Sequence, residues 1–279
     1  MRTVYLGTSD FAAAILERLA GSEHRPSLVV TRPDAPRGRG RKVGPPPVAG
    51  KARELGLELH QPQSVNDAEA RERIAAAAPE ALVVCAFGAL IKEPLLSEHE
   101  ILNVHPSLLP RWRGAAPVER AIMEGDEVTG VSIMQLTAGL DAGPVSLAEA
   151  EPIRATDTFG TLAPRLQELG GGLLIRALTE RPRFVEQDEH HVTYAEKIGP
   201  QDRTLDLARP ALDNERIVRA LHPHIGARIA LSDGTFLGVR AARAREDGRL
   251  ELVEVQPAGG RPMSYTDYLR GHEPAEGVA

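Results

Sequence analysis

Short apolar runs alternate with amphipathic segments over the first 180 residues of the chain. The apolar runs predict strands at residues 3–7, 28–31, 81–86, 101–104 and 130–136. The amphipathic segments predict helices at residues 11–19, 48–55, 69–78, 116–123 and 158–178. The glycines at 170–172 indicate a break or a close packing contact in the last helix. Strands that alternate with helices favour an open, mostly parallel α/β sheet.

The pattern changes after about Val185. One short helix is expected at residues 214–221, followed by strands at 227–231, 236–239 and 250–255. The Asp233-Gly234 pair between the first two strands is a strong hairpin signal. We therefore expect an α/β domain over residues 1–186, a linker over 187–203 and a small β-rich domain over 204–279.

Composition narrows the classes of protein that the chain can represent. The 279 residues carry a net charge of −6, so a polyanion would have to be bound by a local basic patch. The single cysteine, Cys85, excludes an internal disulfide and follows a buried-strand pattern. No run approaches the roughly 18 apolar residues of a membrane helix, and no signal peptide is evident. We expect a cytoplasmic protein.

Residues 32–47 form a basic loop that is long for a connection between a strand and a helix. The loop contains one acid, Asp34, and five bases, Arg32, Arg37, Arg39, Arg41 and Lys42. Charge alone leaves two interpretations open: a solvated insertion, or an arm that contacts phosphates and becomes ordered on binding.

Several common site motifs are missing. The first strand-to-helix turn has Gly7 but no G-x-G-x-x-G, and neither a P-loop lysine nor a G-x-S-x-G elbow occurs. The pairs His190-His191 and His222-Pro223-His224 lack metal-ligand spacing and are expected in solvated loops, so no metal site is predicted.

Three polar residues are the best candidates for chemistry. Asn103 and His105 lie two apart at the end of a predicted strand, so both side chains point to the same face. Asp141 lies between glycines in Gly139–Gly143, after another predicted strand. In an open α/β sheet these groups would meet outside the carboxyl ends of the strands. An amide, an imidazole and a carboxylate together suit acyl transfer, although each residue alone is more often structural.

The stretch Asn-Val-His-Pro-Ser-Leu-Leu-Pro at residues 103–110 resembles the signature of the formyltransferases that use 10-formyltetrahydrofolate. Its continuation Arg-Trp-Arg-Gly-Ala-Ala-Pro at 111–117 is similar to the members that act on aminoacylated tRNA. Further similarities lie at residues 31–42, 130–134, 139–143, 193–197 and 256–264.

This resemblance implies a Rossmann-like formyltransferase domain followed by a small OB-like domain. It implies formyl transfer from 10-formyltetrahydrofolate to methionyl-tRNA, the initiator tRNA, by a monomer without a metal. The catalytic residues would be Asn103, His105 and Asp141. The folate site would be lined by Ser107, Leu108, Leu109, Pro110, Ala86, Phe87 and Gly88. The tRNA would be contacted by Arg37, Arg39, Arg41 and Lys42.

The chain departs from the family pattern in two ways, and four other functions compete. The second domain is shorter than usual by about one hairpin and is not obviously basic, and Pro106 replaces a frequent glycine. A sugar-nucleotide N-formyltransferase or a formyltetrahydrofolate hydrolase would keep the same three residues. An RNA-binding protein without catalysis would not need Asp141, and a purine-pathway formyltransferase would not need the second domain.

Overall fold

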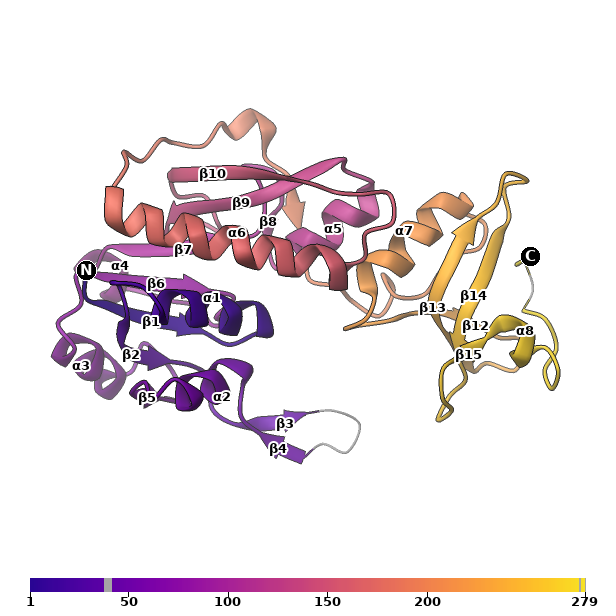
Figure 1. The fold of residues 1–279 in the computed structure, drawn as a ribbon, viewed down its shortest axis with the longest axis horizontal. Helices are drawn as coiled ribbons and strands as arrows, with labels where there is room; N and C mark the ends of the chain where they lie inside the picture. Colours follow the sequence, from indigo (N-terminus) through magenta and orange to yellow (C-terminus); the bar gives the residue numbers. More distant parts are fainter. Residues whose placement is uncertain (38–41, 276, 279) are drawn as a thin grey trace. The chain divides into compact units, whose positions relative to one another are not determined.

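The computed structural model describes residues 1–37, 42–275 and 277–278. These residues form two compact units (Figure 1). The first unit comprises Met1–Arg113, Gly130–Glu151 and Pro164–Thr193, and the second comprises Gly114–Thr129, Pro152–Ala163 and Tyr194–Ala279. The expected domain limits at residues 186 and 204 remain a prediction. Across the described residues, we find no helix with the length and apolar character needed to cross a membrane.

A seven-stranded sheet runs through the first unit in the order β10-β9-β7-β6-β1-β2-β5. The pairings from β5 to β7 are all parallel, whereas β9 runs antiparallel to β7. The predicted mostly parallel α/β sheet is therefore confirmed. The strands are β1 Thr3–Gly7, β2 Pro26–Val30, β5 Leu59–His60, β6 Ala81–Cys85, β7 Ile101–His105, β9 Val128–Gln135 and β10 Val145–Pro152.

Helices cover both faces of this sheet. Along β1, Val4 and Leu6 belong to a core that includes Ile74 of α3 and Leu95 of α4. Tyr5 points the other way, and its hydroxyl donates to the Ala12 carbonyl of α1. The continuous apolar character of the inner strands follows from this two-sided burial. The helices are α1 Asp10–Ala20, α2 Pro47–Glu54, α3 Ala68–Ala76, α4 Leu95–Glu98 and α6 Phe159–Glu180.

Helix α6 is continuous through its glycine run. A methyl group on Gly170 would lie 3.1 Å from Val104 of β7, and one on Gly171 would lie 2.7 Å from the Arg18 side chain of α1. Gly170 and Gly171 therefore permit close packing, and the run does not break the helix, which decides between the two possibilities that the sequence left open.

The basic loop contains regular structure that the sequence did not predict. Strands β3 (Ala35–Arg37) and β4 (Lys42–Gly44) pair antiparallel before α2 begins. The high proline, glycine and arginine content of the loop hid this short hairpin, because neither strand has an apolar run. Arg39 and Arg41 lie outside the described residues.

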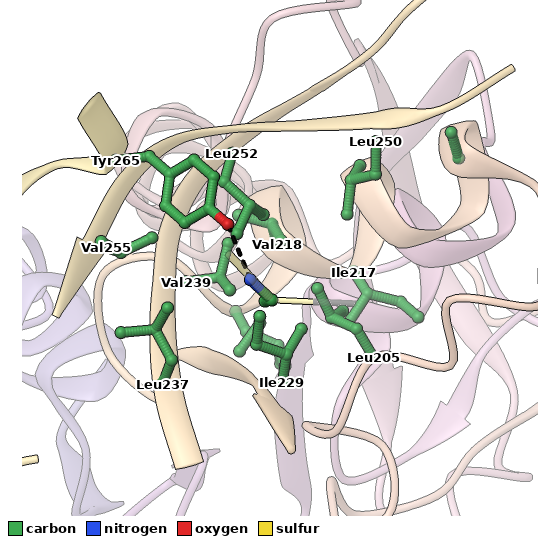
Figure 2. Close-up of a cluster of buried hydrophobic side chains, with 14 of the residues drawn as sticks. Leu205, Ile217, Val218, Ile229, Leu237, Val239, Leu250, Leu252, Val255 and Tyr265 are labelled. Atoms are coloured by element: carbon green, nitrogen blue, oxygen red, sulfur yellow. Dashed lines mark hydrogen bonds between the residues drawn. The ribbon is translucent and has the colours of Figure 1, made fainter. Parts of the chain in front are cut away.

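The second unit contains a four-stranded antiparallel sheet in the order β12-β13-β14-β15. The predicted Asp-Gly hairpin is confirmed, with Gly234 at φ +81° between β12 and β13. Figure 2 shows the core of this unit, in which Leu237, Val239 and Val255 are almost fully buried. The other helices of the chain are α5 Pro117–Glu124, α7 Ala211–Leu221, α8 Tyr265–Tyr268 and the 3₁₀ turn Glu189–His191. The other strands are β8 Arg113–Gly114, β11 Tyr194–Ala195, β12 Ala227–Ala230, β13 Phe236–Ala244, β14 Leu250–Gln256 and β15 Met263–Ser264.

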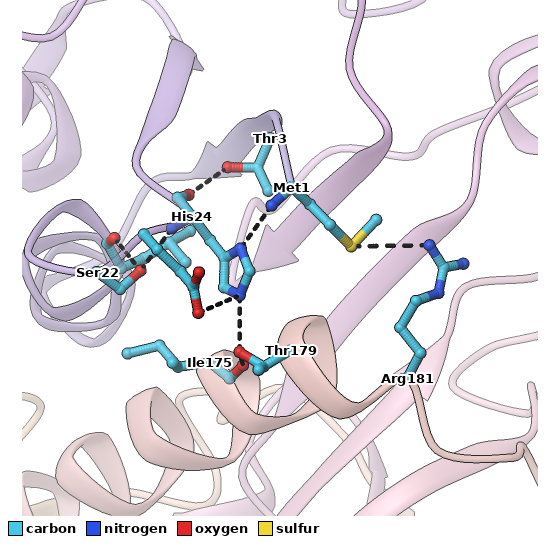
Figure 3. Close-up of polar contacts among 9 residues, drawn as sticks. Met1, Thr3, Ser22, His24, Ile175, Thr179 and Arg181 are labelled. Carbon is cyan, nitrogen blue, oxygen red and sulfur yellow. Dashed lines mark hydrogen bonds and ion pairs between the residues drawn. The ribbon is translucent and has the colours of Figure 1, made fainter.

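Two buried titratable groups in the first unit are structural. The His24 ring contacts the Met1 amine through Nδ1 at 2.7 Å and the Thr179 hydroxyl through Nε2 at 2.8 Å (Figure 3). The Thr179 hydroxyl donates to the Ile175 carbonyl, so it accepts from Nε2–H, and Nδ1 is the acceptor. Cys85 is buried, as predicted, and burial raises the pKa of its thiol to about 12.

Candidate active site

Asn103 and His105 lie on one face of β7, at its carboxyl end. Ile101 belongs to the core on the face covered by α3 and α4, and side chains two apart on a strand share a face. Val104 points to the opposite face, against Gly170 of α6. Asn103 is 7% exposed and His105 is 4% exposed. The side chains of Asn103 and His105 therefore lie on the same face of β7, as the sequence predicted.

The turn after β7 is held by the hydroxyl groups of Ser107 and of Ser132. Ser107 Oγ donates to the Arg111 carbonyl at 2.6 Å, and Ser132 Oγ of β9 donates to the Ser107 carbonyl at 2.8 Å. The Leu109 amide donates to the same Ser132 hydroxyl at 3.1 Å. Ser107 is fully buried, whereas residues 108–110 are partly exposed. The turn thus presents Leu108, Leu109 and Pro110 at its surface while Ser107 sets its shape.

A backbone carbonyl determines one proton position on His105. The Nε2 atom lies 2.8 Å from the carbonyl oxygen of Trp112. A carbonyl only accepts, so Nε2 carries a proton whether the ring is neutral or charged. The Trp112 backbone has φ +66°, and its amide donates to Thr193 Oγ1 at 2.9 Å. The ring nitrogen that remains for chemistry is Nδ1.

Asp141 lies beside this second nitrogen. Its Oδ2 is 3.6 Å from His105 Nδ1, and its side chain is 14% exposed. The sequence argument expected the three groups to meet outside the carboxyl ends of their strands, which requires β9 to be parallel to β7, and that reason was wrong. Because β9 is antiparallel, its carboxyl end is next to Ile101, where the Leu136 amide donates to the Ile101 carbonyl. The loop after β9 must run back toward the end of β7 to bring Asp141 to His105.

The loop that carries Asp141 has a strained and tightly packed backbone. Asp141 has φ +46°, a region that few non-glycine residues adopt. A methyl group on Gly143 would lie 1.9 Å from the Gln135 carbonyl, so only glycine fits there. The Gln187 side-chain amide donates to the carbonyls of Asp141 and Gly143 at 2.8 and 2.7 Å.

The other predicted site residues lie on neighbouring elements. Residues 86–88 follow β6, which is parallel to β7, so they reach the same edge of the sheet. Ala86 and Gly88 are exposed with positive φ, whereas the Phe87 ring is buried in the core. A cavity of about 270 Å³ lies beside Phe87, and its lining includes Arg32 and Lys92. Arg37 ends β3 and Lys42 begins β4.

Sequence reasoning did not find two contributors to this site. The Trp112 carbonyl is a backbone group, and no pattern of side chains in the sequence predicts its contact with His105. Gln187 lies in a polar segment that was expected to be a linker, where its neighbours Glu186 and Asp188 are exposed. No pattern in the sequence marks Gln187; its partial burial, which the structure shows, is what indicates a hydrogen-bonded amide.

Known proteins resemble this chain over nearly its whole length. Residues 1–178 match the family profile described as formyl transferase. A methionyl-tRNA formyltransferase of Halorhodospira halophila is 42% identical, and the match covers 97% of this chain and 96% of the relative. The enzyme of the same name from Ruegeria pomeroyi is 40% identical, with 97% of each chain covered.

Solved structures support the fold. The methionyl-tRNA formyltransferase from Clostridium thermocellum matches with a TM-score of 0.63 at 13% identity, covering 95% of this chain and 99% of that one. A sugar N-formyltransferase from Shewanella has a TM-score of 0.65 at 18% identity, covering 86% and 96%. At these identities the likeness concerns the fold alone. Through the family profile and its near-full-length relatives, the chain belongs to the formyl transferase family, in the group of the methionyl-tRNA formyltransferases.

Proposed function

We infer that the protein transfers a formyl group to the α-amino group of methionyl-tRNA, which prepares the initiator tRNA for translation initiation. Formyltetrahydrofolates are the donors of this family, and we propose 10-formyltetrahydrofolate here. The observation that carries the proposal is the pairing of His105 with Asp141 on the strand face that also presents Asn103.

The chemistry suits such a site. The α-amino group of an esterified methionine has a pKa of about 8 or lower, so much of it is neutral near pH 7. Its lone pair attacks the formyl carbon, a C–N bond forms, and the carbonyl oxygen becomes an oxyanion. The intermediate collapses by breaking the bond to the folate nitrogen, which gains a proton while the new amide loses one. These steps need an oxyanion donor and a group that moves a proton, and none of them calls for a metal ion.

We propose that Asn103 and His105 donate to the oxyanion. Because Nε2 of His105 is bonded to the Trp112 carbonyl, the donor must be Nδ1–H of the protonated ring. Asp141 would stabilise that cation across the 3.6 Å separation and take part in moving the proton from the amine to the folate nitrogen. One oxyanion donor can be worth roughly 3–4 kcal/mol of transition-state stabilisation.

The substrate contacts are also proposals. The partly exposed residues 108–110 and the backbone at 86–88 would line the folate site, with Ser107 shaping the turn. Arg37, Arg39, Arg41 and Lys42 would contact phosphates at the acceptor end of the tRNA. The antiparallel sheet of the second unit supports an OB-like assignment, shortened relative to the family. We further propose that the protein works as a monomer in the cytoplasm.

The direct test is formyl transfer from 10-formyltetrahydrofolate to methionyl-tRNA, with free methionine and an amino-sugar nucleotide as parallel acceptors. Product on methionyl-tRNA alone supports the proposal. Product on the sugar, or release of formate without transfer, would overturn the acceptor assignment and leave the three-residue site in place.

A further inference from the structure

The segment at residues 187–193 bonds to both sides of the His105–Asp141 pair. On one side, Gln187 Nε2 donates to the carbonyls of Asp141 and Gly143. On the other side, Thr193 Oγ1 accepts from the amide of Trp112, whose carbonyl bonds to His105 Nε2. One short segment therefore contacts the backbone on which each partner of the pair depends.

Chemistry determines how the Gln187 amide is oriented. Its Oε1 lies 3.0 Å from Arg113 Nε, and a guanidinium only donates. Its Nε2 faces two backbone carbonyls, which only accept. A flipped amide would set donor against donor and acceptor against acceptors, so a single orientation satisfies all three contacts.

Arg113 is itself held in place. Its side chain is 3% exposed, and its two terminal nitrogens lie 2.7 and 3.3 Å from the carboxylate oxygens of Glu189. The hydrogen bond from the Arg113 guanidinium lowers the pKa of that carboxyl below its ordinary value. The Arg113 amide also donates to the Thr193 carbonyl at 2.9 Å. Gln187 is thus anchored at Oε1 by a buried group that cannot move freely.

The two carbonyls that Gln187 bonds belong to a loop whose backbone is in an unfavourable conformation at Asp141. Asp141 has φ +46°, which is costly for a residue with a Cβ, and such conformations persist when the surroundings hold them. Gln187 bonds the carbonyls of Asp141 itself and of Gly143, two residues on. These bonds oppose relaxation of the loop and so maintain the distance between Asp141 Oδ2 and His105 Nδ1.

We propose that Gln187 is a positioning residue for formyl transfer, which holds the Asp141 loop in the conformation that places the carboxylate beside His105. This role rests on the proposed function, because its consequence is a rate. It predicts that loss of the amide lowers kcat and leaves substrate binding nearly unchanged, since Oε1 and Nε2 of Gln187 are already bonded to Arg113 and to the carbonyls of Asp141 and Gly143.

The test compares wild type, Gln187→Met and the matched control Gln256→Met. Gln256 also donates to one backbone carbonyl and accepts from an arginine, but in the second unit. We expect Gln187→Met to lower kcat by about tenfold to a hundredfold, the scale of a displaced catalytic group, with KM for both substrates within about threefold. Gln256→Met should keep wild-type kcat. A wild-type kcat in Gln187→Met would overturn the proposal.

A double-mutant cycle separates positioning from general support of the fold. If Gln187 acts through Asp141, then in an Asp141→Asn background Gln187→Met should lower kcat by less than about threefold, because coupled residues are not additive. Equal losses in both backgrounds would overturn the proposal.

Gln187→Glu supplies a second variant in case the methionine variant folds poorly. Glutamate keeps an acceptor for Arg113 and places a carboxylate oxygen against two carbonyls. We expect it to lose kcat as Gln187→Met does. Wild-type activity in Gln187→Glu would mean that only the Arg113 contact matters, and would overturn the role at Asp141. Wild-type transfer is measured first, so an enzyme that fails to formylate methionyl-tRNA would overturn the proposed function and not this role specifically.

Discussion

Replacing Gly143 by alanine would add one methyl group at the tightest point of the loop that carries Asp141. The new carbon would lie 1.9 Å from the Gln135 carbonyl and 3.0 Å from a methyl group of Thr137. Because such carbons stay beyond about 3.0 Å from other atoms, the loop must move by about 1 Å. It cannot move freely, since the Gly143 carbonyl accepts from Gln187 and the next carbonyl, of Pro144, accepts from the Gln135 amide.

A shift of this size two residues from Asp141 sets the expected magnitude. A displacement of about 1 Å at a reacting group can cost about a hundredfold in rate, and overpacking costs typically 1–3 kcal/mol of stability. Gly143→Ala should therefore lower kcat by about a hundredfold and also lower the melting temperature. The assay is steady-state formylation of methionyl-tRNA together with a thermal unfolding curve.

Gly172→Ala is the matched control for this substitution. Gly172 is exposed in the interior of α6, and a methyl group there would meet nothing within 4 Å. The same change should stabilise the helix by about 0.5–1 kcal/mol and leave kcat unchanged. The reasoning is refuted if Gly143→Ala retains kcat within about threefold, because Asp141 would then tolerate the displacement that this rate estimate assumes to be damaging.

Three further perturbations test other parts of the structure. Asp141→Asn should fold normally and lower turnover by about 10²- to 10⁴-fold, measured in single-turnover formylation; near-normal turnover would remove Asp141 from the mechanism. Arg39 lies in the segment outside the described residues. Arg39→Ala should raise KM for methionyl-tRNA much more than KM for the folate, and it should weaken the salt dependence of KM for methionyl-tRNA. Equal changes in KM for both substrates would contradict a contact between Arg39 and the tRNA. Burial first, and then the N-terminal ammonium, lower the pKa of His24 below its ordinary 6.5. The unfolded chain therefore binds this proton more readily, so the free energy of unfolding should fall as pH drops below about 6.5, and His24→Gln should lack that loss in urea unfolding at pH 8 to 5. If the free energy of unfolding of His24→Gln depends on pH as that of the wild type does, the role assigned to His24 is contradicted.

Local patterns accounted for most of the elements. Strands β1 and β6 followed from their apolar runs, and α1 followed from its amphipathic pattern, with Ser9 accepting from the Ala12 amide at its start. The elements that were missed lack such patterns. Strand β10 has no fully buried residue, and β5 has only two residues, so neither produces a periodic signal.

The features of the candidate site also separate into those that a local sequence pattern predicts and those that it does not. The sequence alone determined that Asn103 and His105 share a face, because a strand repeats every two residues whatever surrounds it. It also indicated that the glycines on both sides of Asp141 permit close backbone approach, although the structure shows that Gly143 approaches the Gln135 carbonyl.

Only the tertiary structure decided how these groups meet. The antiparallel direction of β9, the return of its loop to His105, and the Trp112 carbonyl on Nε2 all depend on how distant segments pack. Gln187 bonds to Asp141 across 46 residues of chain, and Trp112 bonds to Thr193 across 81. Periodicity and capping are properties of neighbouring residues, so the sequence displays them directly. Partners at such separations are selected by the packed fold as a whole, and no local pattern encodes them.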